Sequence, residues 1–322
     1  MTVSRVINNS GHTSREARER VEAAIAKLGY VPNALARGLR FKQTQTIALV
    51  VTDITNPFFT TVARGVEDAA SEQSFSVMFC NTDESQGEEL EYLNVLVQKQ
   101  TDGVLLVPAS DSVESLTFLK SQATPVVVVD RRVSGFQVDT VRCDSEQGAY
   151  LLVRYLIELG HRRIAALMGP RAVSTAIDRS AGYQRALAEA GLDDGQHPVL
   201  HDSYSQKGGY RMAREVLSSS QLPTALFAGN NLIAVGVLRA LREVGLRVPE
   251  DISVVAFDDI PESLVMDQFL TVMTQPAYEI GRRATELLLD RLCGEGPADV
   301  QEIVLPTELV VRKSAGPPRP LA

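Results

Sequence analysis

The chain has 322 residues with 44% hydrophobic and 6% aromatic content, an ordinary globular composition that excludes a mainly disordered chain and allows two domain-sized cores. The formal net charge is −8, but residues 1–45 contain eight Lys or Arg and three Asp or Glu, so a basic head of +5 precedes an acidic body of −13. A basic head indicates a polyanionic partner, either nucleic acid or an anionic membrane surface.

The head begins with TVSRVIN, in which Val3, Val6 and Ile7 form an apolar face opposite polar side chains, and we expect a short helix there. SREARERVEAAIAKLG follows as a second helix capped by Ser14. The next segment, NALARGL at residues 33–39, is about two turns long, below the roughly 12–15 residues that an isolated helix needs in water. It should therefore fold only against a partner.

From residue 45 onward, short apolar runs alternate with amphipathic helical patterns. The runs are TIALVV, FSVMFC, DGVLLVP, PVVVVD, RIAALMG, TALFAG and ISVVAFD. Continuous apolar runs separated by helices are typical of parallel strands covered on both faces, so we predict a doubly wound α/β body with two parallel sheets. One helix should begin after Asp144 and end at Gly160, and another should end at Gly245.

These elements divide the chain into a head, a connecting segment, a two-lobed body and a tail. We place the head at residues 1–30, the connecting segment at 31–44 and the body at 45–313. Lobe 1 spans about 45–144 plus 275–303, and lobe 2 spans about 145–272 plus 304–313. The tail, 314–322, is rich in Pro and Gly and is expected to be disordered.

A ligand is expected between the lobes. Open α/β sheets bind ligands beyond the carboxyl ends of their strands, and two facing lobes bring two sets of such ends to one cleft. The polar segments that directly follow the apolar runs are residues 53–59, Asp130, Asn230 and the pair Asp258 and Asp259.

Other protein classes lack their usual signals. No apolar stretch reaches the roughly 18 residues of a membrane span and no signal peptide precedes the head, so we expect a cytoplasmic protein without membrane contact. Cys80, Cys143 and Cys293 form no Cys-x-x-Cys pair, and the four histidines form no metal-spaced pair, so no disulfide, metal or other cofactor is expected. The sequence also lacks the common catalytic and phosphate-binding motifs, which argues against an enzyme, and we assign His161 to a helix-to-strand turn.

Several motifs converge on one family. TVSRVIN, REARERVEAAIAKLGYVPNALARGL, IALVVTDITNPFF, LGHRRIAALMGP and DISVVAFDD occur in this order, and from Thr2 to about Arg312 the chain resembles the lactose-repressor (LacI/GalR) family of bacterial transcriptional regulators. The resemblance implies a helix-turn-helix head whose second helix lies in the DNA major groove and a hinge helix that folds in the minor groove. It also implies a periplasmic-binding-protein-like body that dimerises and senses a small molecule.

The resemblance assigns DNA contacts in the head and the hinge. Short donors would contact phosphates, Arg5 would read a guanine edge, and Leu39 would wedge into a base step. The full set is Thr2, Ser4, Arg5, Asn8, His12, Ser14, Asn33, Ala36, Arg37 and Leu39. Taken singly, such residues more often have structural roles, such as helix capping, and only their joint spacing favours DNA.

The chain departs from the family at the start of the head. Members carry a further helix and a turn before the position of Met1, and that helix packs on the face formed by Val3, Val6 and Ile7. Its loss would leave this apolar face exposed, so we expect the chain from Met1 onward to bind DNA poorly. An internal methionine taken for a start, or a truncated chain, would explain the departure.

On the body, the resemblance assigns effector contacts from both lobes. They are Phe58, Phe59 and Asp130 on lobe 1, and Thr175, Arg179, Tyr204, Asn230 and Asp258 on lobe 2. Aromatic rings stack on the apolar face of a sugar while carboxylates, an amide and an arginine bind its hydroxyls, so a sugar or sugar derivative is expected. Val173 stands near an arginine of a purine-binding relative, which argues against a purine. The structural alternative is that the phenylalanines cover a core and the two aspartates cap helices.

The sequence therefore predicts a repressor that binds a pseudo-palindromic operator in double-stranded DNA as a homodimer, with effector closure of the cleft biasing hinge folding. A C-terminal end without leucine heptads favours a dimer over a tetramer. One alternative is a cytoplasmic small-molecule-binding dimer of the same fold that has lost DNA binding with the missing helix. Another is a secreted solute-binding protein, which shares the body but has no use for a basic head.

Overall fold

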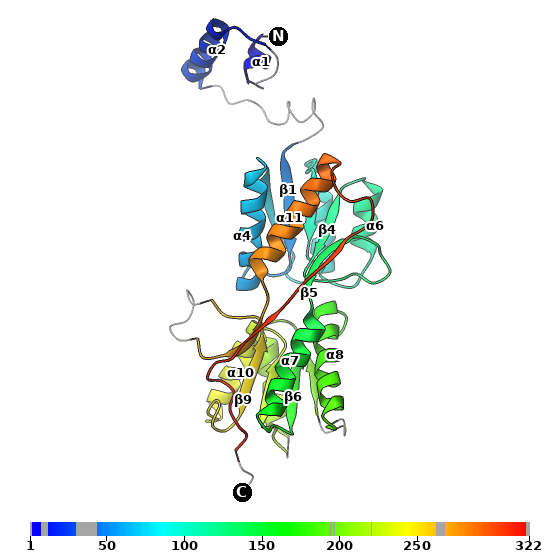
Figure 1. Cartoon of the computed structure of the whole chain (residues 1–322), viewed down its shortest axis with the longest axis vertical. Helices are drawn as coiled ribbons and strands as arrows, with labels where there is room; N and C mark the ends of the chain where they lie inside the picture. The colour runs from blue at the N-terminus through cyan, green and yellow to red at the C-terminus, as the bar shows by residue number, and fades with distance from the viewer. Residues whose placement is uncertain are drawn as a thin grey trace.

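The computed structural model describes residues 2–7, 12–29, 44–192, 195, 197–219, 221–261 and 268–319. Figure 1 shows a small helical head and an elongated body made of two α/β lobes stacked end to end. Within these ranges, no helix is long and apolar enough to cross a membrane. The hinge helix predicted over residues 33–39 lies outside the described residues.

The head consists of α1 (Thr2–Ile7) and α2 (Arg15–Leu28). The Ser14 hydroxyl accepts a hydrogen bond from the Ala17 amide at 3.3 Å, so Ser14 caps α2 as predicted. The helix ends at Gly29, whose φ of 58° is left-handed and is adopted by glycine without strain.

Lobe 1 is built around a parallel six-stranded sheet in the order β11-β5-β4-β3-β1-β2. Its strands are β1 (Thr46–Val51), β2 (Ser76–Asn81), β3 (Gly103–Leu106), β4 (Val126–Val129), β5 (Asp139–Cys143) and β11 (Glu302–Leu305). Helices α4 (Pro57–Glu72) and α11 (Ala277–Cys293) pack on one face, and α5 (Gln86–Gln98) and α6 (Glu114–Ser121) pack on the other. Strands β1, β3 and β4 are buried on both faces, which is why their sequences read as continuous apolar runs, whereas the edge strands β2 and β11 are partly exposed.

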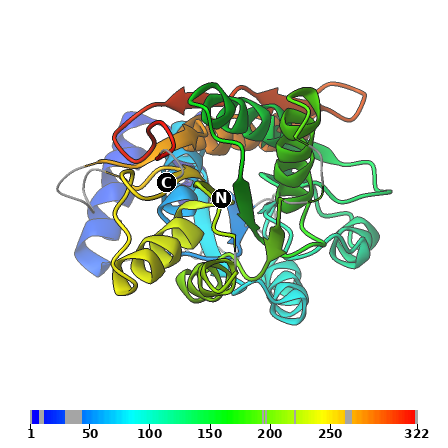
Figure 2. The ribbon, with the colours of Figure 1, turned by 90° about the horizontal axis from the view of Figure 1, so that it is seen from below.

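Lobe 2 repeats this topology, with the strand order β12-β10-β9-β8-β6-β7. Its strands are β6 (Ile164–Met168), β7 (Val199–His201), β8 (Ala225–Ala228), β9 (Ser253–Phe257), β10 (Thr271–Thr274) and β12 (Glu308–Val310). Figure 2 shows α7 (Ser145–Glu158) and α8 (Ser174–Glu189) on one side of the sheet and α9 (Gln206–Leu217) and α10 (Asn231–Glu243) on the other. Only the edge strand β12 runs antiparallel among the described strands. The predicted fold class, two doubly wound sheets in a two-lobed body, is confirmed.

The chain passes between the lobes at three short connections (Figure 1). They lie at residue 144 between β5 and α7, at 275–276 between β10 and α11, and at 306–307 between β11 and β12. Because each connection is only one or two residues long, few backbone dihedrals join the lobes, and this is the arrangement that permits one lobe to rotate against the other.

The prediction of a disordered tail is wrong for residues 314–319. Ser314 is fully buried; its hydroxyl donates to the Val254 carbonyl at 2.6 Å and accepts from the Thr271 amide at 2.7 Å. His161 contacts the Gly316 carbonyl through Nε2 at 2.9 Å and the Thr224 hydroxyl through Nδ1 at 2.9 Å. The tail is thus fixed by polar groups at the edge of lobe 2, which its Pro- and Gly-rich composition does not reveal. The assignment of His161 to the turn between α7 and β6 is confirmed.

Helices α4 and α11 cross so closely that glycine is required on both. A Cβ on Gly65 would lie 2.1 Å from the Tyr278 carbonyl oxygen, and one on Gly281 would lie 2.1 Å from the Val62 carbonyl oxygen. We expect Gly65→Ala to lower the free energy of unfolding by about 3 kcal/mol, because rigid backbone must move apart. Gly87→Ala in α5 is the matched control, since its Cβ would meet only the Ser85 hydroxyl at 3.8 Å.

Gly87→Ala should raise the free energy of unfolding by up to about 1 kcal/mol, the ordinary gain of alanine over glycine in a helix. Urea midpoints of the two variants and the parent protein give the comparison. Equal midpoints for Gly65→Ala and Gly87→Ala would contradict the close crossing.

Candidate ligand cleft and nucleic-acid-binding head

The carboxyl ends of the strands and the starts of several helices meet in a cleft between the two lobes. Its lining includes all eight residues predicted as effector contacts, namely Phe58, Phe59, Asp130, Thr175, Arg179, Tyr204, Asn230 and Asp258. It also includes Asp53, Asn56, Glu84, Arg131 and Gln275. The structure therefore brings the predicted side chains together, and whether they bind a ligand stays a prediction.

Asp130 and Asp258 occupy equivalent positions in the two lobes. Each follows the third strand from one end of its sheet, β4 in lobe 1 and β9 in lobe 2. Each donates its backbone amide to the neighbouring strand, Asp130 to the Val141 carbonyl and Asp258 to the Met273 carbonyl, both at 2.9 Å. Their φ angles are 66° and 64°, in the left-handed region that non-glycine residues rarely occupy. This shared strain directs the carboxylates into the cleft, and such strain concentrates at functional sites. Neither residue caps a helix among the described elements, so the structural alternative fails there for both.

Arg179 on α8 lies beside the two aspartates. Its Nη1 donates to the Gly229 carbonyl at 2.7 Å, and the same atom lies 3.8 Å from an Asp258 oxygen. The guanidinium carbon is 3.9 Å from the centroid of the Phe257 ring. The carbonyl and the ring hold this buried cation in one place.

Burial shapes the charge state of the two aspartates. It raises the pKa of Asp130 to about 6, although Arg179 and Arg131 act in the opposite direction. It also raises the pKa of Asp258, against the effect of Arg179 and of a hydrogen bond from Gln275 Nε2 at 2.7 Å. The Oδ1 atom of Asp130 is buried and has no hydrogen-bond partner among the described residues. The cleft therefore contains a carboxylate that is poised to accept hydrogen bonds.

Arg131, the second arginine of the cleft, is occupied by protein groups. It donates to both carboxylate oxygens of Glu84, at 2.7 and 2.6 Å, and to the Pro108 carbonyl at 2.8 Å. Glu84 accordingly raises the pKa of Arg131, although burial alone would lower it. This bidentate pair neutralises one cation and one carboxylate of the lining.

Three aromatic rings add apolar surface to the cleft. Phe58 and Phe59 meet edge to face with centroids 5.1 Å apart, and both belong to the lobe 1 core. The structural alternative therefore applies to both, and their contact with a ligand stays a prediction. The ring of Tyr204 lies over Gly169, where a Cβ would come within 2.1 Å of it, and its hydroxyl is 3.0 Å from the Thr175 hydroxyl. Such rings suit the apolar face of a sugar.

The lobes are closed on each other. The Asn231 side-chain amide donates to Asn56 Oδ1 at 3.1 Å, and the Arg132 backbone amide donates to the Ser174 hydroxyl at 2.8 Å. The Arg132 guanidinium also pairs with Asp178. The cavity left between the lobes is about 20 Å³, little more than one water molecule requires, so any larger ligand needs the lobes to part.

The sequence did not assign Glu84, Arg131 or Gln275 to the cleft, whereas Asp53 and Asn56 fell within the segment 53–59. Each missed residue closely follows a strand: Glu84 follows β2, Arg131 follows Asp130 after β4, and Gln275 follows β10. The rule that polar groups at strand ends line the cleft would have found them if it had been applied to every strand. Within the described ranges, no group of three or more His, Cys, Asp and Glu is arranged to hold a metal ion.

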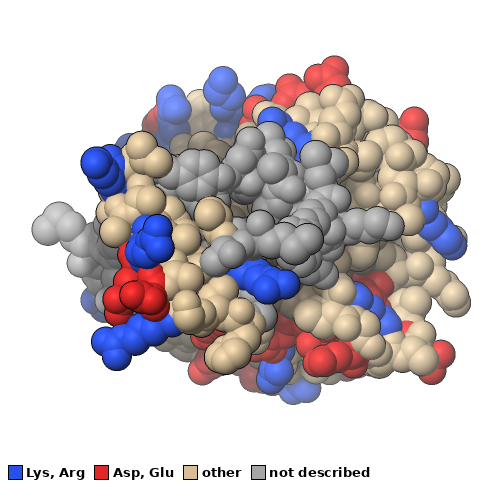
Figure 3. Space-filling model, turned by 90° about the horizontal axis from the view of Figure 1, so that it is seen from above, with Lys and Arg blue, Asp and Glu red and all other residues tan. Residues whose placement is uncertain are grey.

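Only part of the predicted DNA-binding set has side chains among the described residues. Arg5 on α1 is exposed, as are His12 and Ser14, and the Ser14 hydroxyl is engaged in capping. The side chains of Thr2 and Ser4 lie outside the described residues, as do Asn8, Asn33, Ala36, Arg37 and Leu39. Figure 3, viewed from the head end, shows Lys and Arg side chains spread over the visible face among acidic and neutral residues.

The apolar face of α1 is exposed in part. Val3 is 54% exposed, as expected, and lines an apolar groove with Val21, Ile25 and Leu28 of α2. Val6 is only 7% exposed, so the expectation that it is uncovered is wrong, because α1 packs against α2. The Ile7 side chain lies outside the described residues.

Comparisons with known proteins match both parts of the chain. Residues 44–308 match the family described as periplasmic binding proteins and sugar binding domain of LacI family, and residues 1–33 match the bacterial regulatory proteins of the lacI family. The HTH-type transcriptional repressor PurR of Haemophilus influenzae (strain PittEE) is 35% identical over 316 residues, which cover 97% of this chain and 94% of that protein.

Two solved structures show the same overall fold. The transcriptional regulator CelR in complex with cellobiose is 34% identical with a TM-score of 0.78, over 97% of this chain and 94% of that one. The lac repressor dimer bound to operator and the anti-inducer ONPF is 27% identical with a TM-score of 0.86, over 98% of this chain and 94% of that one. These relatives are transcriptional regulators and not enzymes. The resemblance found in the sequence is confirmed: the chain belongs to the LacI family of bacterial regulatory proteins.

Proposed function

We propose that the chain is a cytoplasmic, ligand-responsive transcriptional repressor that binds a pseudo-palindromic operator in double-stranded DNA as a homodimer, with a sugar or sugar derivative in the cleft as its effector. One observation carries the effector assignment. The buried Asp130 carboxylate lies in a cleft with Arg179 and retains an oxygen without a hydrogen-bond partner among the described residues. A hydroxyl-rich ligand supplies the donors that such a group lacks.

Further features of the cleft support a sugar. Aromatic rings and polar groups line it together, which is the combination that binds the apolar face and the hydroxyls of one sugar ring. The related CelR structure contains cellobiose. The buried Val173 before α8 lies near where a purine-binding relative has an arginine, and this difference favours the sugar assignment here.

The head supports the DNA assignment. α1 carries the exposed Arg5 in its last turn, and an arginine on a recognition helix is suited to bidentate contact with guanine. The related lac repressor structure is a dimer bound to its operator. We extend the proposal to the hinge contacts Asn33, Ala36, Arg37 and Leu39 and to the phosphate contacts of the head, all of which remain predictions.

The proposed coupling runs through the segment that joins the head to β1. Asp102 fixes the entry of this segment into lobe 1, because it accepts from the Thr44 amide at 2.7 Å and from the Thr46 amide at 3.3 Å. A movement of lobe 1 on effector binding is therefore transmitted to the last residues of the hinge. Hinge folding on DNA then links the two sites thermodynamically.

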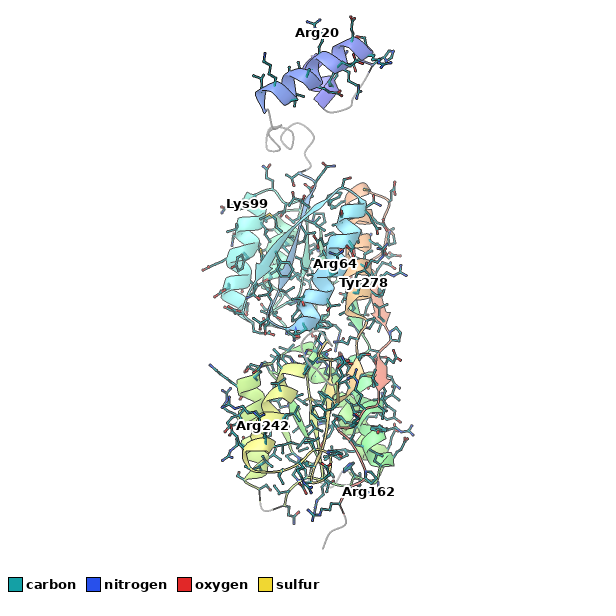
Figure 4. The ribbon with its side chains drawn as sticks, turned by 90° about the vertical axis from the view of Figure 1, so that its left-hand side faces the viewer. Arg20, Arg64, Lys99, Arg162, Arg242 and Tyr278 are labelled. Atoms are coloured by element: carbon teal, nitrogen blue, oxygen red, sulfur yellow. The ribbon has the colours of Figure 1, made fainter. Side chains whose placement is uncertain are left out.

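The test selects DNA from a random duplex pool with the full chain and measures affinity for the selected sequence by fluorescence anisotropy. We expect Arg5→Ala to weaken binding by about 10- to 100-fold, the usual value of one bidentate base contact. Arg242→Ala is the matched control, because it removes the same charge from an exposed residue at the far end of lobe 2 (Figure 4). It should leave the affinity unchanged.

Hydrogen exchange of residues 31–43 with and without the selected DNA tests the hinge. Protection that appears only with DNA is the expected result, and equal protection in both states would refute the coupling. If no DNA sequence is selected while a sugar still raises the thermal midpoint, the second candidate function, a ligand-binding dimer without DNA contact, replaces the first. The partly exposed apolar face of the head, with Val3 uncovered, favours that second candidate.

A further inference from the structure

The charges that line the cleft are unbalanced. Four carboxylates line it, from Asp53, Glu84, Asp130 and Asp258, against the two cations Arg131 and Arg179. The bidentate pair of Arg131 with Glu84 cancels internally. What remains is one arginine facing three carboxylates, a formal excess of two negative charges when all are ionised.

We propose that the cleft selects against anions, so that its effector is a sugar carrying neither a phosphate nor a carboxylate group. This inference rests on the proposed function of the cleft as a sugar site. A phosphate ester would place further negative charge beside Asp130 and Asp258, where little water screens the repulsion. A neutral sugar instead offers hydroxyl donors to the same carboxylates.

Both arginines already face carboxylates of the cleft. Arg131 already donates to two Glu84 oxygens and to a backbone carbonyl, and an anion that recruited it would leave the Glu84 carboxylate without its partner. Arg179 donates to the Gly229 carbonyl and lies 3.8 Å from an Asp258 oxygen, so its charge already serves the aspartates, while its Nε has no hydrogen-bond partner among the described residues.

The helix N-termini at the cleft do not offset this excess of negative charge. Asn56 and Asn230 already cap α4 and α10 by accepting from the Phe58 amide at 3.0 Å and the Ile233 amide at 2.8 Å. The start of α8 has no side-chain cap and would attract an anion, but one helix start changes affinity by less than about tenfold. Two uncompensated carboxylates outweigh that attraction.

The test titrates the full-length protein with matched sugars by calorimetry at pH 7.5. The pairs are glucose with glucose 6-phosphate, ribose with ribose 5-phosphate, and cellobiose with cellobiose 6-phosphate. We expect at least one neutral member to bind and its phosphate ester to bind at least about 100-fold more weakly. A phosphate ester that binds as tightly as its neutral partner, or more tightly, would overturn the inference.

Inorganic phosphate tests the charge balance without any sugar. It should leave the thermal midpoint of the parent protein unshifted but raise that of Asp130→Asn and of Glu84→Gln, each of which makes the cleft more positive by one charge. Glu158→Gln is the control, because it makes the same change at the exposed end of α7, where Glu158 pairs with Arg154 at 2.7 Å. The neighbouring Arg162 lies at the end of lobe 2 away from the cleft (Figure 4).

The outcomes separate the two proposals. If no sugar binds, neutral or phosphorylated, the proposed sugar-sensing function fails, and the phosphate experiment alone decides on the charge selectivity. If phosphate raises the thermal midpoint of the parent protein by as much as that of the two cleft variants, the proposed selectivity against anions is overturned. A rise in the cleft variants only, with Glu158→Gln behaving as the parent, supports it.

Discussion

Arg179→Met is expected to lower the free energy of unfolding by about 3–5 kcal/mol and to abolish effector binding. Met occupies a similar volume, so the loss comes from charge. Without the guanidinium, the buried Asp258 and Asp130 carboxylates lose the cation that they share, and breaking a buried ion pair by removing one partner has a cost of this size. The Gly229 carbonyl also loses the hydrogen bond that it accepts at 2.7 Å.

The double variant Arg179→Met with Asp258→Asn identifies the source of that loss. Neutralising Asp258 should restore about half of the stability, because one of the two uncompensated charges disappears. Arg239→Met is the matched control: Arg239 is 68% exposed and pairs with Glu243 on the same helix, so its loss should change stability by less than about 1 kcal/mol. Scanning calorimetry of the four proteins measures these differences. A double variant no more stable than Arg179→Met would show that packing, and not charge, is lost.

Asp130→Asn is expected to stabilise the protein while it weakens effector binding. Burial raises the pKa of Asp130 from 3.8 to about 6, so the folded protein binds this proton more tightly than the unfolded chain. The contribution of Asp130 to the stability of the parent protein therefore falls as the pH rises from about 4 to about 6 and stays at the lower level above pH 6. Asn resembles the protonated acid, and its side chain is well tolerated at the φ of 66° found here.

The stability difference between Asp130→Asn and the parent protein should thus be near zero below pH 4 and reach about 3 kcal/mol in favour of the variant above pH 6. Urea unfolding at pH 4.0, 5.0, 6.0 and 7.5 measures this profile. A difference that does not change with pH would contradict the raised pKa. A substitution that raises stability while it weakens binding is characteristic of residues retained for function.

Much of the body was predictable because burial on both faces leaves a direct mark on the sequence. TIALVV and PVVVVD became β1 and β4, whose side chains are almost all inaccessible to solvent. Asp130 and Asp258 were found because a polar residue that ends such a run must lie at the carboxyl edge of a sheet. Their equivalent positions and shared left-handed backbone were not predictable, because aspartate only weakly favours that conformation.

The ion pair between Arg131 and Glu84 depends on tertiary structure. Glu84 follows β2 and Arg131 follows β4, and these strands are separated in the sheet by β1 and β3. No local pattern indicates that two side chains meet across such a distance in sequence. The ordered tail was missed for the same reason: Ser314 is held by Val254 and Thr271, partners that composition does not reveal.

The strand order has a consequence for how the protein is made. Lobe 1 requires α11 and β11, and lobe 2 requires β12, yet these elements all follow residue 276 in the chain. During synthesis from the N-terminus, neither sheet acquires its last strand until residues 302–310 are made. Domains generally fold as units while they emerge, but here both lobes are completed almost together. A ribosome that stalls before β11 would release two incomplete sheets, each with an open edge available for pairing with another chain.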